Sequence, residues 1–204
     1  GAGRTEIMEM LFGMEPYQGE IRIGGERVDV TEPSRAIELG LGFVTEDRKQ
    51  QGLVLNMTVR ENFSLTHLGD YCTFDFVNES KEGEACDVYV RDLGIKTPSI
   101  EQKAQNLSGG NQQKIVIAKW VARNPRILIV DEPTRGIDIG AKAEVHALLR
   151  RVAEKGVGII MISSDLPEVL AVSDRIVILK EGRISGELDR AAANQERVME
   201  LATG

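Results

Sequence analysis

The sequence predicts an α/β fold in which helices cover both faces of a parallel sheet. Two segments, "RILIVDEP" (126–133) and "VGIIMISS" (157–164), begin with apolar runs that are typical of strands buried on both faces. Between them, "GAKAEVHALLRRVAEKG" (140–156) has the spacing of an amphipathic helix that stops at a glycine. At the start, the glycine turn "GAGRTE" (1–6) leads directly into the helix-like "IMEMLFGM" (7–14). Buried strands that alternate with helices indicate a parallel sheet.

Shorter elements precede the long strands. The segment "GEIRIGGERVDV" (19–30) alternates apolar and polar residues around a Gly-Gly pair, which predicts a β-hairpin. A short helix ended by glycine is predicted for "PSRAIELG" (33–40), and a short strand that runs into a charged loop for "LGFVTEDR" (41–48). We expect residues 1–56 to form part of the α/β core.

Residues 57–124 are predicted to form a helical subdomain. The segments "TVRENFSLTHL" (58–68) and "EGEACDVYVRDLGI" (82–95) are amphipathic, and the polar stretch between them is predicted to be a loop or a short connection. A further helix, capped by its serine and ended by its proline, is predicted for "SGGNQQKIVIAKWVARNP" (108–125).

The last part of the chain, 125–204, is predicted to complete the core. After the second apolar strand we expect a short helix, two strands across a turn, and a final helix, at "DLPEVLAVS" (165–173), "DRIVILKEGRISGEL" (174–188) and "NQERVMELAT" (194–203).

The composition limits the classes of protein to which the chain can belong. The 204 residues are 42% apolar and 28% charged, which is typical of one globular domain or of a core with a subdomain. A net charge of −7 argues against nucleic-acid binding. Cys72 and Cys86 lack metal-ligand spacing, so we expect unpaired thiols in a cytosolic protein. We expect Trp120 to be a core residue, and His67 and His146 to be surface or packing residues.

Two acidic residues follow the first apolar strand. Asp131 and Glu132 are placed at the carboxyl end of a parallel sheet, where ligands bind in this architecture. An aspartate in this position can hold Mg²⁺, and a following carboxylate can polarise an attacking water. The alternative is an acidic strand end followed by a proline turn, and the motif alone does not separate the two interpretations.

The stretch "LSGGNQQK" (107–114) is a second candidate site. Ser108, Gly109 and Gly110 place a hydroxyl and exposed backbone N–H groups at the start of a helix, which is a nest for phosphate oxygens. A helix cap reached through a flexible turn is the alternative. The position of this stretch one helix before the acidic strand end favours the phosphate interpretation.

These motifs together resemble a known family. The segments "LSGGNQQK" and "VDEPTRGIDIGAK" closely resemble the signature and Walker B segments of ABC-transporter ATPases. The stretches "GAGRTE", "TEDRKQQGLVLNMTVRENFSL" and "ISSDLPEVLAVSDRIVILKEGR" look like the C-terminal, second nucleotide-binding domain of the tandem ATP-binding subunit of bacterial monosaccharide importers, the ribose, galactose and xylose group. The resemblance extends from residue 1 to about residue 201. It implies a P-loop ATPase core with an inserted helical subdomain, with ATP and Mg²⁺ as cofactors.

The resemblance assigns roles to individual residues. Asp131 matches the aspartate that coordinates Mg²⁺, and Glu132 the catalytic carboxylate. The signature matches the residues that contact the γ-phosphate of ATP held by the partner domain, and Asp138 matches the D-loop aspartate that communicates across the dimer. The signature residues are Ser108, Gly109, Gly110 and the adjacent Asn111.

Three positions depart from the family pattern. Arg4 stands where the Walker A lysine belongs, Glu46 where the Q-loop glutamine belongs, and Ser164 where the switch histidine belongs. Thr5 keeps the hydroxyl suited to Mg²⁺. The resemblance therefore implies a degenerate phosphate loop with an intact signature, so that the main chemistry lies across the dimer interface. The phosphate-loop residues that would contact nucleotide are Gly1, Ala2, Gly3, Arg4, Thr5 and Glu6.

The resemblance also implies partners and a location. The partners would be the N-terminal nucleotide-binding domain of the same subunit or a second ATPase copy, the transmembrane permease subunits and, indirectly, a periplasmic sugar-binding protein. No nucleic acid is expected. The protein would lie in the cytoplasm, peripheral on the inner face of the cell membrane. The loop "TEDRK" (45–49) would lie near the membrane-domain contact, and its alternative interpretation is a solvated charge run.

Two rival functions remain. In the first, this half is a non-hydrolysing structural or regulatory module of the ATPase subunit. In the second, the chain is an ABC ATPase of DNA repair or translation, which the acidic charge disfavours. The chain starts inside the phosphate loop, without the preceding strand and the β-subdomain. We therefore expect a fragment that is inactive alone and that has reduced stability or self-associates.

Overall fold

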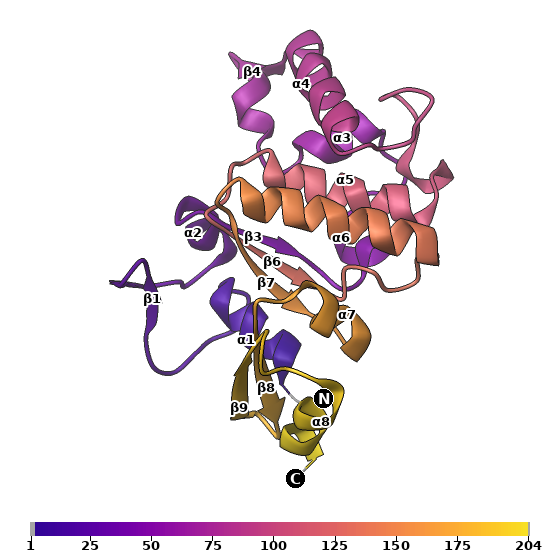
Figure 1. Ribbon diagram of the computed structural model, residues 1–204. Helices are drawn as coiled ribbons and strands as arrows, with labels where there is room; N and C mark the ends of the chain where they lie inside the picture. The colour runs from indigo at the N-terminus through magenta and orange to yellow at the C-terminus, as the bar shows by residue number, and fades with distance from the viewer. Residues whose placement is uncertain (1–2, 204) are drawn as a thin grey trace. The chain divides into compact units, whose positions relative to one another are not determined.

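The computed structural model describes residues 3–203, and its fold is α/β. Contacts divide the chain into two compact units. The larger unit contains residues 39–160, and the smaller unit contains residues 3–38 and 161–203. The predicted helical insertion, 57–124, lies within the larger unit, whose elements appear in purple to orange in Figure 1.

The sheet of the larger unit contains the predicted buried strands. Strands β3 (Leu41–Val44) and β6 (Ile127–Asp131) are parallel neighbours, with Val44 opposite Val130. All four residues of β3 are buried, and so are the last four of β6. The parallel sheet predicted from the apolar runs is therefore confirmed.

Strand β7 (Gly158–Ile162) follows β6 in the sheet order β3–β6–β7. It is less buried than its apolar sequence predicts, since Ile160 is 37% exposed. Within the part of the chain that the structure describes, β7 is one of the two edge strands of this sheet, and the fully buried β3 is the other. Exposure alternates along β7, with Gly158 and Ile160 exposed and Ile159 and Met161 half-buried, so one face of the strand is left uncovered and the expectation of full burial on both faces is wrong for β7.

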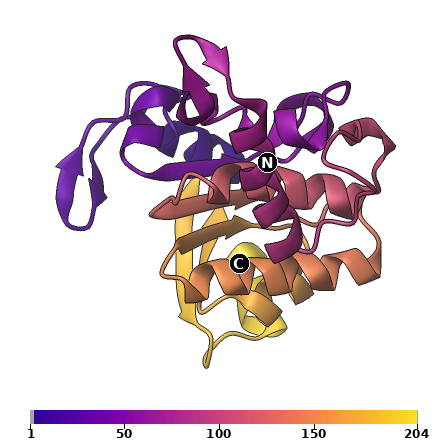
Figure 2. The ribbon, with the colours of Figure 1, turned by 90° about the horizontal axis from the view of Figure 1, so that it is seen from above.

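Two long helices cover this sheet. Helix α5 (Gly109–Val121) packs against β3 and against α6 (Ile139–Glu154). Figure 1 shows the two helices side by side, and Figure 2 shows the same pair from above. In α6 the buried residues recur at intervals of three and four, which places them on one helical face. They are Val145, Leu148, Leu149 and Val152.

The start of the helical region is fixed by a capping box. Thr58 accepts a hydrogen bond from the Glu61 amide at 3.1 Å, and Glu61 accepts one from the Thr58 amide at 2.7 Å. Hydrogen bonding of the Glu61 carboxylate by the backbone amide and the side chain of Thr58 lowers the pKa of Glu61. The resulting helix α3 (Val59–Ser64) packs against α5 and against α4 (Glu79–Asp92), so both predicted helices are confirmed.

The stretch between α3 and α4 is a short connection, which is one of the two predicted alternatives, but it is more regular than its polar sequence indicates. It contains a 3₁₀ turn, Leu68–Tyr71, and a hairpin of β4 (Cys72–Thr73) and β5 (Phe76–Val77). The two turn residues have φ of 49° and 66°, which is the geometry of a type I′ turn. This turn usually contains Asn-Gly, and the Phe-Asp sequence found here gives no such signal.

Replacing Asp75 by glycine should raise the free energy of unfolding by about 0.5–1 kcal/mol, because glycine adopts a positive φ without the Cβ clash. Urea denaturation followed by circular dichroism measures the change. The matched control is Asp75→Ala, which removes the same carboxylate but keeps a Cβ in the left-handed conformation. No gain for glycine over alanine would contradict the prediction.

Both ends of α5 differ in detail from the expectation. Ser108 occupies the N-cap position, but its hydroxyl accepts a hydrogen bond from the Asn111 amide group at 2.9 Å and does not cap the helix backbone. The helix ends at Val121, before Pro125. Asn124 then adopts a left-handed φ of 51°, which turns the chain before the proline can act as the stop.

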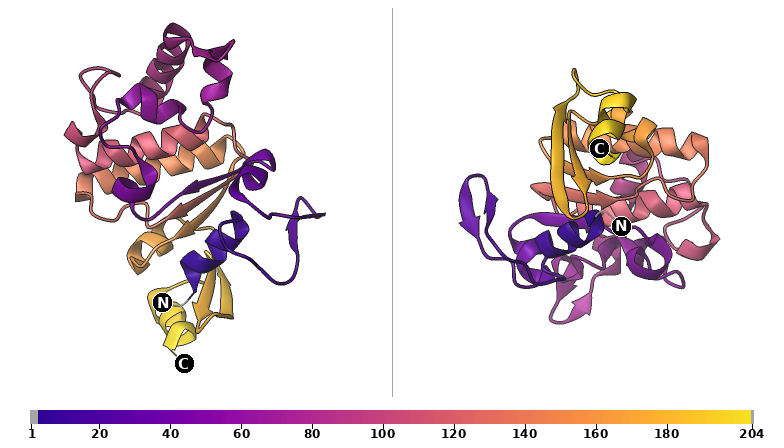
Figure 3. Two further views of the ribbon diagram at one scale, coloured as in Figure 1. Left: turned by 180° about the vertical axis from the view of Figure 1, so that it is seen from behind. Right: turned by 90° about the horizontal axis from the view of Figure 1, so that it is seen from below.

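The smaller unit contains the first and last parts of the chain. Its predicted elements are confirmed, and Figure 3 shows helix α8 packed against the hairpin of β8 and β9. The core of this hairpin and helix contains Ile176, Ile178, Leu188 and Val198. The elements are α1 (Arg4–Leu11), β1 (Ile21–Ile23), β2 (Glu26–Val28), α2 (Pro33–Glu38), α7 (Leu166–Val172), β8 (Arg175–Lys180), β9 (Arg183–Asp189) and α8 (Gln195–Thr203).

The structure also tests the expectations for single residues. Both cysteines are free thiols, and burial raises the pKa of Cys86 to about 12. Trp120 is buried, as expected of a core residue. His67 is a packing residue, with its ring centroid 5.0 Å from that of Phe63. No cluster of three metal-ligating side chains and no helix able to cross a bilayer occurs among residues 3–203.

Candidate functional site

The acidic pair lies at the carboxyl end of β6. Asp131 is the last residue of the strand and is 1% exposed. Because β3 and β6 are parallel neighbours, the loop that contains Glu46 starts at the same end of the sheet, where the carboxyl ends of both strands lie. Glu132 has a left-handed φ of 45°, and its carbonyl accepts a hydrogen bond from the Arg135 amide at 3.0 Å. The strand therefore ends in a tight turn that starts at Glu132.

The loop after this turn leads into α6. Asp138 is the N-cap of α6, and its carboxylate accepts a hydrogen bond from the Ala141 amide at 2.8 Å. Gly136 has a φ of +66°, a conformation that glycine adopts without strain. The predicted D-loop aspartate thus has a structural role as a helix cap. Its role across a dimer interface stays a prediction.

The signature glycines lie against other segments of the larger unit. A Cβ on Gly110 would lie 2.5 Å from the Cβ of Ala141 in α6, and a Cβ on Gly109 would lie 2.7 Å from Nη2 of Arg48. Asn111 is also held, since its Oδ1 accepts a hydrogen bond from the Lys96 amide at 2.8 Å. Close packing against α6 therefore requires glycine at residue 110, whereas a side chain at residue 109 would have to displace the Arg48 guanidinium. The backbone amides at this end of α5 begin the helix and carry its partial positive charge.

The "TEDRK" loop is bonded to the loop that follows β6. Glu46 forms an ion pair with Arg135, and Asp47 accepts hydrogen bonds from the amides of Lys49 at 2.9 Å and Gln50 at 3.1 Å. Arg48 donates to the carbonyl of Arg135 at 2.8 Å and to the carbonyl of Gly136 at 3.2 Å. Asp47 and Lys49 are exposed, so the interpretation as a solvated charge run describes part of this loop, but Glu46 and Arg48 are bonded to the loop after β6.

The contacts of Arg48 and Arg135 were not predicted from the sequence. The bonded residues are separated by 87 and 88 positions in the chain, so no local pattern links them. The one local signal is the run of charged residues in "TEDR" directly after a buried strand. That pattern is equally typical of a solvated turn.

In the smaller unit, the phosphate-loop positions can be followed from Gly3 onward, because Gly1 and Ala2 lie outside the described residues. Gly3 is the N-cap of α1, with a left-handed φ of 84°, and Thr5 lies in the first turn together with Glu6. Arg4 directs its guanidinium to the end of β7, where Nη1 donates to the Ser163 carbonyl at 2.9 Å. The cation in the lysine position is therefore engaged by the backbone of its own unit.

The two serines after β7 differ in their surroundings. Ser163 is buried, its hydroxyl donates to the buried carboxylate of Glu168, and it accepts a hydrogen bond from the Asp165 amide at 3.0 Å. Ser164, in the position of the switch histidine, is exposed. Ser163 is thus more than the polar end of a strand, because it connects β7 to α7. Glu168 was not predicted from the sequence to be a functional or structural residue of this site.

The predicted site residues are divided between the two units. The larger unit contains Glu46, the signature, Asp131, Glu132 and Asp138, and contacts join the Glu46 loop to the loop after β6 and to Gly109. The smaller unit contains the described phosphate-loop residues and Ser164.

Comparisons with known proteins identify the family. A family model described as ABC transporter matches residues 1–135. The ribose import ATP-binding protein RbsA of Bacillus subtilis is 50% identical over 205 aligned residues, and that of Oceanobacillus iheyensis is 51% identical. Both alignments cover all of this chain, which spans 42% and 41% of the respective relatives.

The comparison of structures agrees with the sequence comparison. The ATP-binding cassette MJ1267 of an ABC transporter superposes with a TM-score of 0.82 at 19% identity, over 100% of this chain and 84% of that chain. At this level of identity the likeness concerns the fold, which is the P-loop ATPase fold expected from the motifs. The match over residues 1–135 extends past the acidic strand end, and the chain therefore belongs to the ABC transporter family.

Proposed function

We propose that this chain is one of two ATP-binding domains of an ABC importer for a simple sugar. Its signature would complete the ATP site of the partner domain, while its own phosphate loop would form a weaker site. The observation that carries this proposal is a contrast between the two motifs. The signature is intact and packed at the start of α5, whereas Arg4 replaces the lysine and donates to the carbonyl of Ser163.

The relatives support the class of substrate. The aligned proteins of Bacillus subtilis and Oceanobacillus iheyensis are named as ribose import ATP-binding proteins, so ribose or a similar monosaccharide is the cargo we propose. The chain spans less than half of those proteins, which leaves room for a second ATP-binding domain of similar size. We place this chain as the C-terminal domain of such a pair.

The residues fit Mg²⁺ and nucleotide in their chemistry. Mg²⁺ prefers hard oxygen ligands, and two residues each offer one such atom: Asp131 a carboxylate oxygen in the larger unit, and Thr5 a hydroxyl oxygen in the smaller unit. Gly3 has no side chain at the start of α1, so the backbone amides there are open to phosphate oxygens. Bound Mg²⁺ would neutralise charge on the phosphates, and Glu132 would orient and polarise the attacking water.

The signature would act on the nucleotide of the partner domain. The Ser108 hydroxyl and the amides of Gly109 and Gly110 would donate to the γ-phosphate, with Asn111 holding the Ser108 hydroxyl in place. Hydrolysis needs positioning and charge neutralisation and no covalent intermediate. Asp138, as the cap of α6, would lie beside this contact.

The site formed by this chain's own phosphate loop should turn over slowly. Arginine is a planar fork with spread charge, so it is a poor replacement for a compact ammonium between phosphates. Glu46 would place negative charge near the phosphates, although it is paired with Arg135. Ser164 lacks the imidazole that would contact the γ-phosphate.

The whole importer would include further subunits. We propose transmembrane permease subunits and a periplasmic sugar-binding protein as partners, with this domain on the cytoplasmic face of the membrane. The Glu46–Arg48 segment would connect the ATP sites to the permease.

A non-hydrolysing structural half is the second candidate function. It is favoured by the engagement of Arg4 with Ser163 and of Glu46 with Arg135, because both charged groups are already satisfied inside the chain. Slow ATP turnover that persists when the N-terminal domain is inactivated would argue against this candidate. Complete loss of turnover in that variant would support it.

The main test is ATP turnover by the full two-domain subunit with Gly109→Asp. The new carboxylate should repel the γ-phosphate, and we expect turnover to fall by about 100-fold or more. The matched control is Gly69→Asp, since a Cβ on Gly69 meets no atom within 4 Å. Gly109→Ala separates the effect of charge from the approach of the new Cβ to Arg48. Turnover near wild type in Gly109→Asp would refute the signature role.

A further inference from the structure

Arg48 connects three segments of the larger unit. It begins the π-helical turn Arg48–Gly52, which follows β3. Its two terminal nitrogens donate separately to the carbonyls of Arg135, at 2.8 Å, and Gly136, at 3.2 Å. One arginine side chain can bond two carbonyls at once because its guanidinium is a rigid, planar group with several N–H donors. The loop after β6 is therefore held through its backbone.

The same guanidinium lies against the first residue of α5. The Cβ position of Gly109 is 2.7 Å from Nη2 of Arg48 and 3.3 Å from the carbonyl oxygen of Gly136. A side chain at residue 109 would displace the guanidinium, so the glycine is what allows the close approach. Arg48 thus lies between the loop after β6 and the signature.

The turn that presents Arg48 is itself anchored. At its start, the Asp47 carboxylate accepts hydrogen bonds from the amides of Lys49 and Gln50. At its end, the Gly52 carbonyl accepts a hydrogen bond from the buried ammonium of Lys119 in α5, at 2.6 Å. The turn therefore contacts α5 through Arg48 at its first residue and through Gly52 at its last.

We infer that Arg48 is a positioning residue that holds the signature and the loop after β6 at a fixed separation. This inference rests on the proposed function. We call these contacts of Arg48 with Gly109 and with the loop after β6 the Arg48 clamp. If Gly109 and this loop, which leads to Asp138, both face the partner's nucleotide, the clamp holds them in their final arrangement beforehand. The entropic cost of ordering them when the two domains close is then removed. Arg48 acts through Gly109 and the loop and contributes no phosphate contact of its own.

Arg48→Gln in the full two-domain protein tests the clamp. Glutamine is too short and too weak a donor to bond both carbonyls. Without nucleotide, we expect hydrogen exchange at the amides of residues 136–141 to accelerate about tenfold or more, because two charge-assisted hydrogen bonds are lost. With ATP, we expect kcat to fall about tenfold or more while KM changes less than about threefold.

Two further variants sharpen the result. Arg48→Lys keeps the charge but offers no fork, so its kcat should lie between wild type and Arg48→Gln. Arg135→Ala removes the ion pair with Glu46 but keeps both carbonyls that Arg48 binds, so the loop should stay protected. The matched control is Arg91→Gln, on the exposed surface of α4, which should leave exchange and kcat unchanged.

Several outcomes would overturn the inference. Unchanged exchange in Arg48→Gln would mean that Arg48 does not hold the loop. Faster exchange with unchanged kcat would mean that the clamp exists but positions nothing for turnover, and a rise in KM alone would indicate a role in binding. The exchange measurement needs no ATP. Hydrogen exchange therefore tests whether Arg48 holds the loop, even if the Gly109→Asp variant keeps wild-type turnover and the proposed function is wrong.

Discussion

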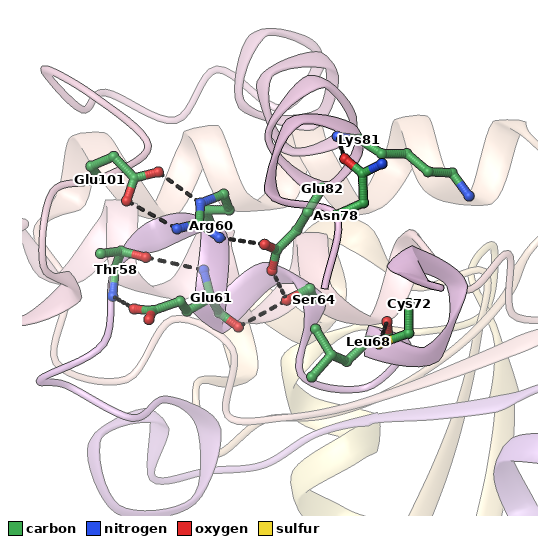
Figure 4. A network of polar contacts seen from close by, with 10 residues as sticks. All are labelled: Thr58, Arg60, Glu61, Ser64, Leu68, Cys72, Asn78, Lys81, Glu82 and Glu101. Carbon is green, nitrogen blue, oxygen red and sulfur yellow. Dashed lines mark hydrogen bonds and ion pairs between the residues drawn. The ribbon is translucent and has the colours of Figure 1, made fainter. Parts of the chain in front are cut away.

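Replacing Glu82 by alanine should lower the free energy of unfolding by about 3–5 kcal/mol. Glu82 is 1% exposed and forms an ion pair with Arg60, and its second oxygen accepts a hydrogen bond from Ser64 (Figure 4). Arg60 is held on its other side by Glu101, at 2.7 Å. Removing Glu82 leaves a largely buried cation without its buried partner, which is the costly way to break such a pair.

Glu101→Ala is the matched control, because Glu101 binds the same arginine but its side chain is 55% exposed. Its loss should cost no more than about 1 kcal/mol. The double variant Arg60→Met, Glu82→Leu removes both charges and should recover most of the loss. Urea denaturation measures all three, and equal effects of the two single glutamate variants would contradict the argument.

The second large effect concerns pH. Lys119 is 7% exposed, and desolvation lowers its pKa from 10.5 to about 8. Keeping this ammonium charged at neutral pH therefore costs roughly 3 kcal/mol, since one pKa unit corresponds to about 1.4 kcal/mol. Between about pH 8 and 10.5 the unfolded chain holds this proton more tightly than the native protein does, so stability rises with pH in that window.

We expect a gain of about 1 kcal/mol between pH 8 and pH 9, measured by urea denaturation. Lys119→Met is the control, and its stability should lack this rise. Above pH 9 the opposite contribution of Cys86 appears, because its pKa is raised from 9.0 to about 12 in the native state and stability is lost as the unfolded thiol ionises. Equal slopes in the wild type and the Lys119→Met variant would contradict the assignment.

Much of the fold could be predicted because it depends on local periodicity. The apolar run at 127–131, the helical spacing at 139–154 and the Gly-Gly hairpin near residue 24 each specify one element, and each is present. The acidic pair could be placed at the strand end for the same reason, since Asp131 follows a run of buried residues.

The features that were not predicted have physical causes that a local sequence pattern does not show. The Phe74–Asp75 turn places a phenylalanine, which rarely adopts a positive φ, at its first position, so the β4–β5 hairpin was not predicted. Arg48 and Arg4 bind carbonyls 87 and 159 positions away, and the chain path that brings them there is a tertiary property. Glu82 lies in a helix that reads as amphipathic, yet it is buried because Arg60 and Ser64 meet it there.

Two buried ammonium groups determine how α5 can move. Lys114 donates to the Gly94 carbonyl at 2.7 Å and to Glu144, while Lys119 donates to the Gly52 carbonyl at 2.6 Å. Five residues apart on a helix of 3.6 residues per turn, these side chains leave the axis in directions roughly 140° apart. Rotation of α5 about its axis would break at least one of these hydrogen bonds and leave a buried ammonium without its carbonyl, which is costly. The two lysines therefore oppose such a rotation and keep the signature, at the first turn of α5, in one orientation.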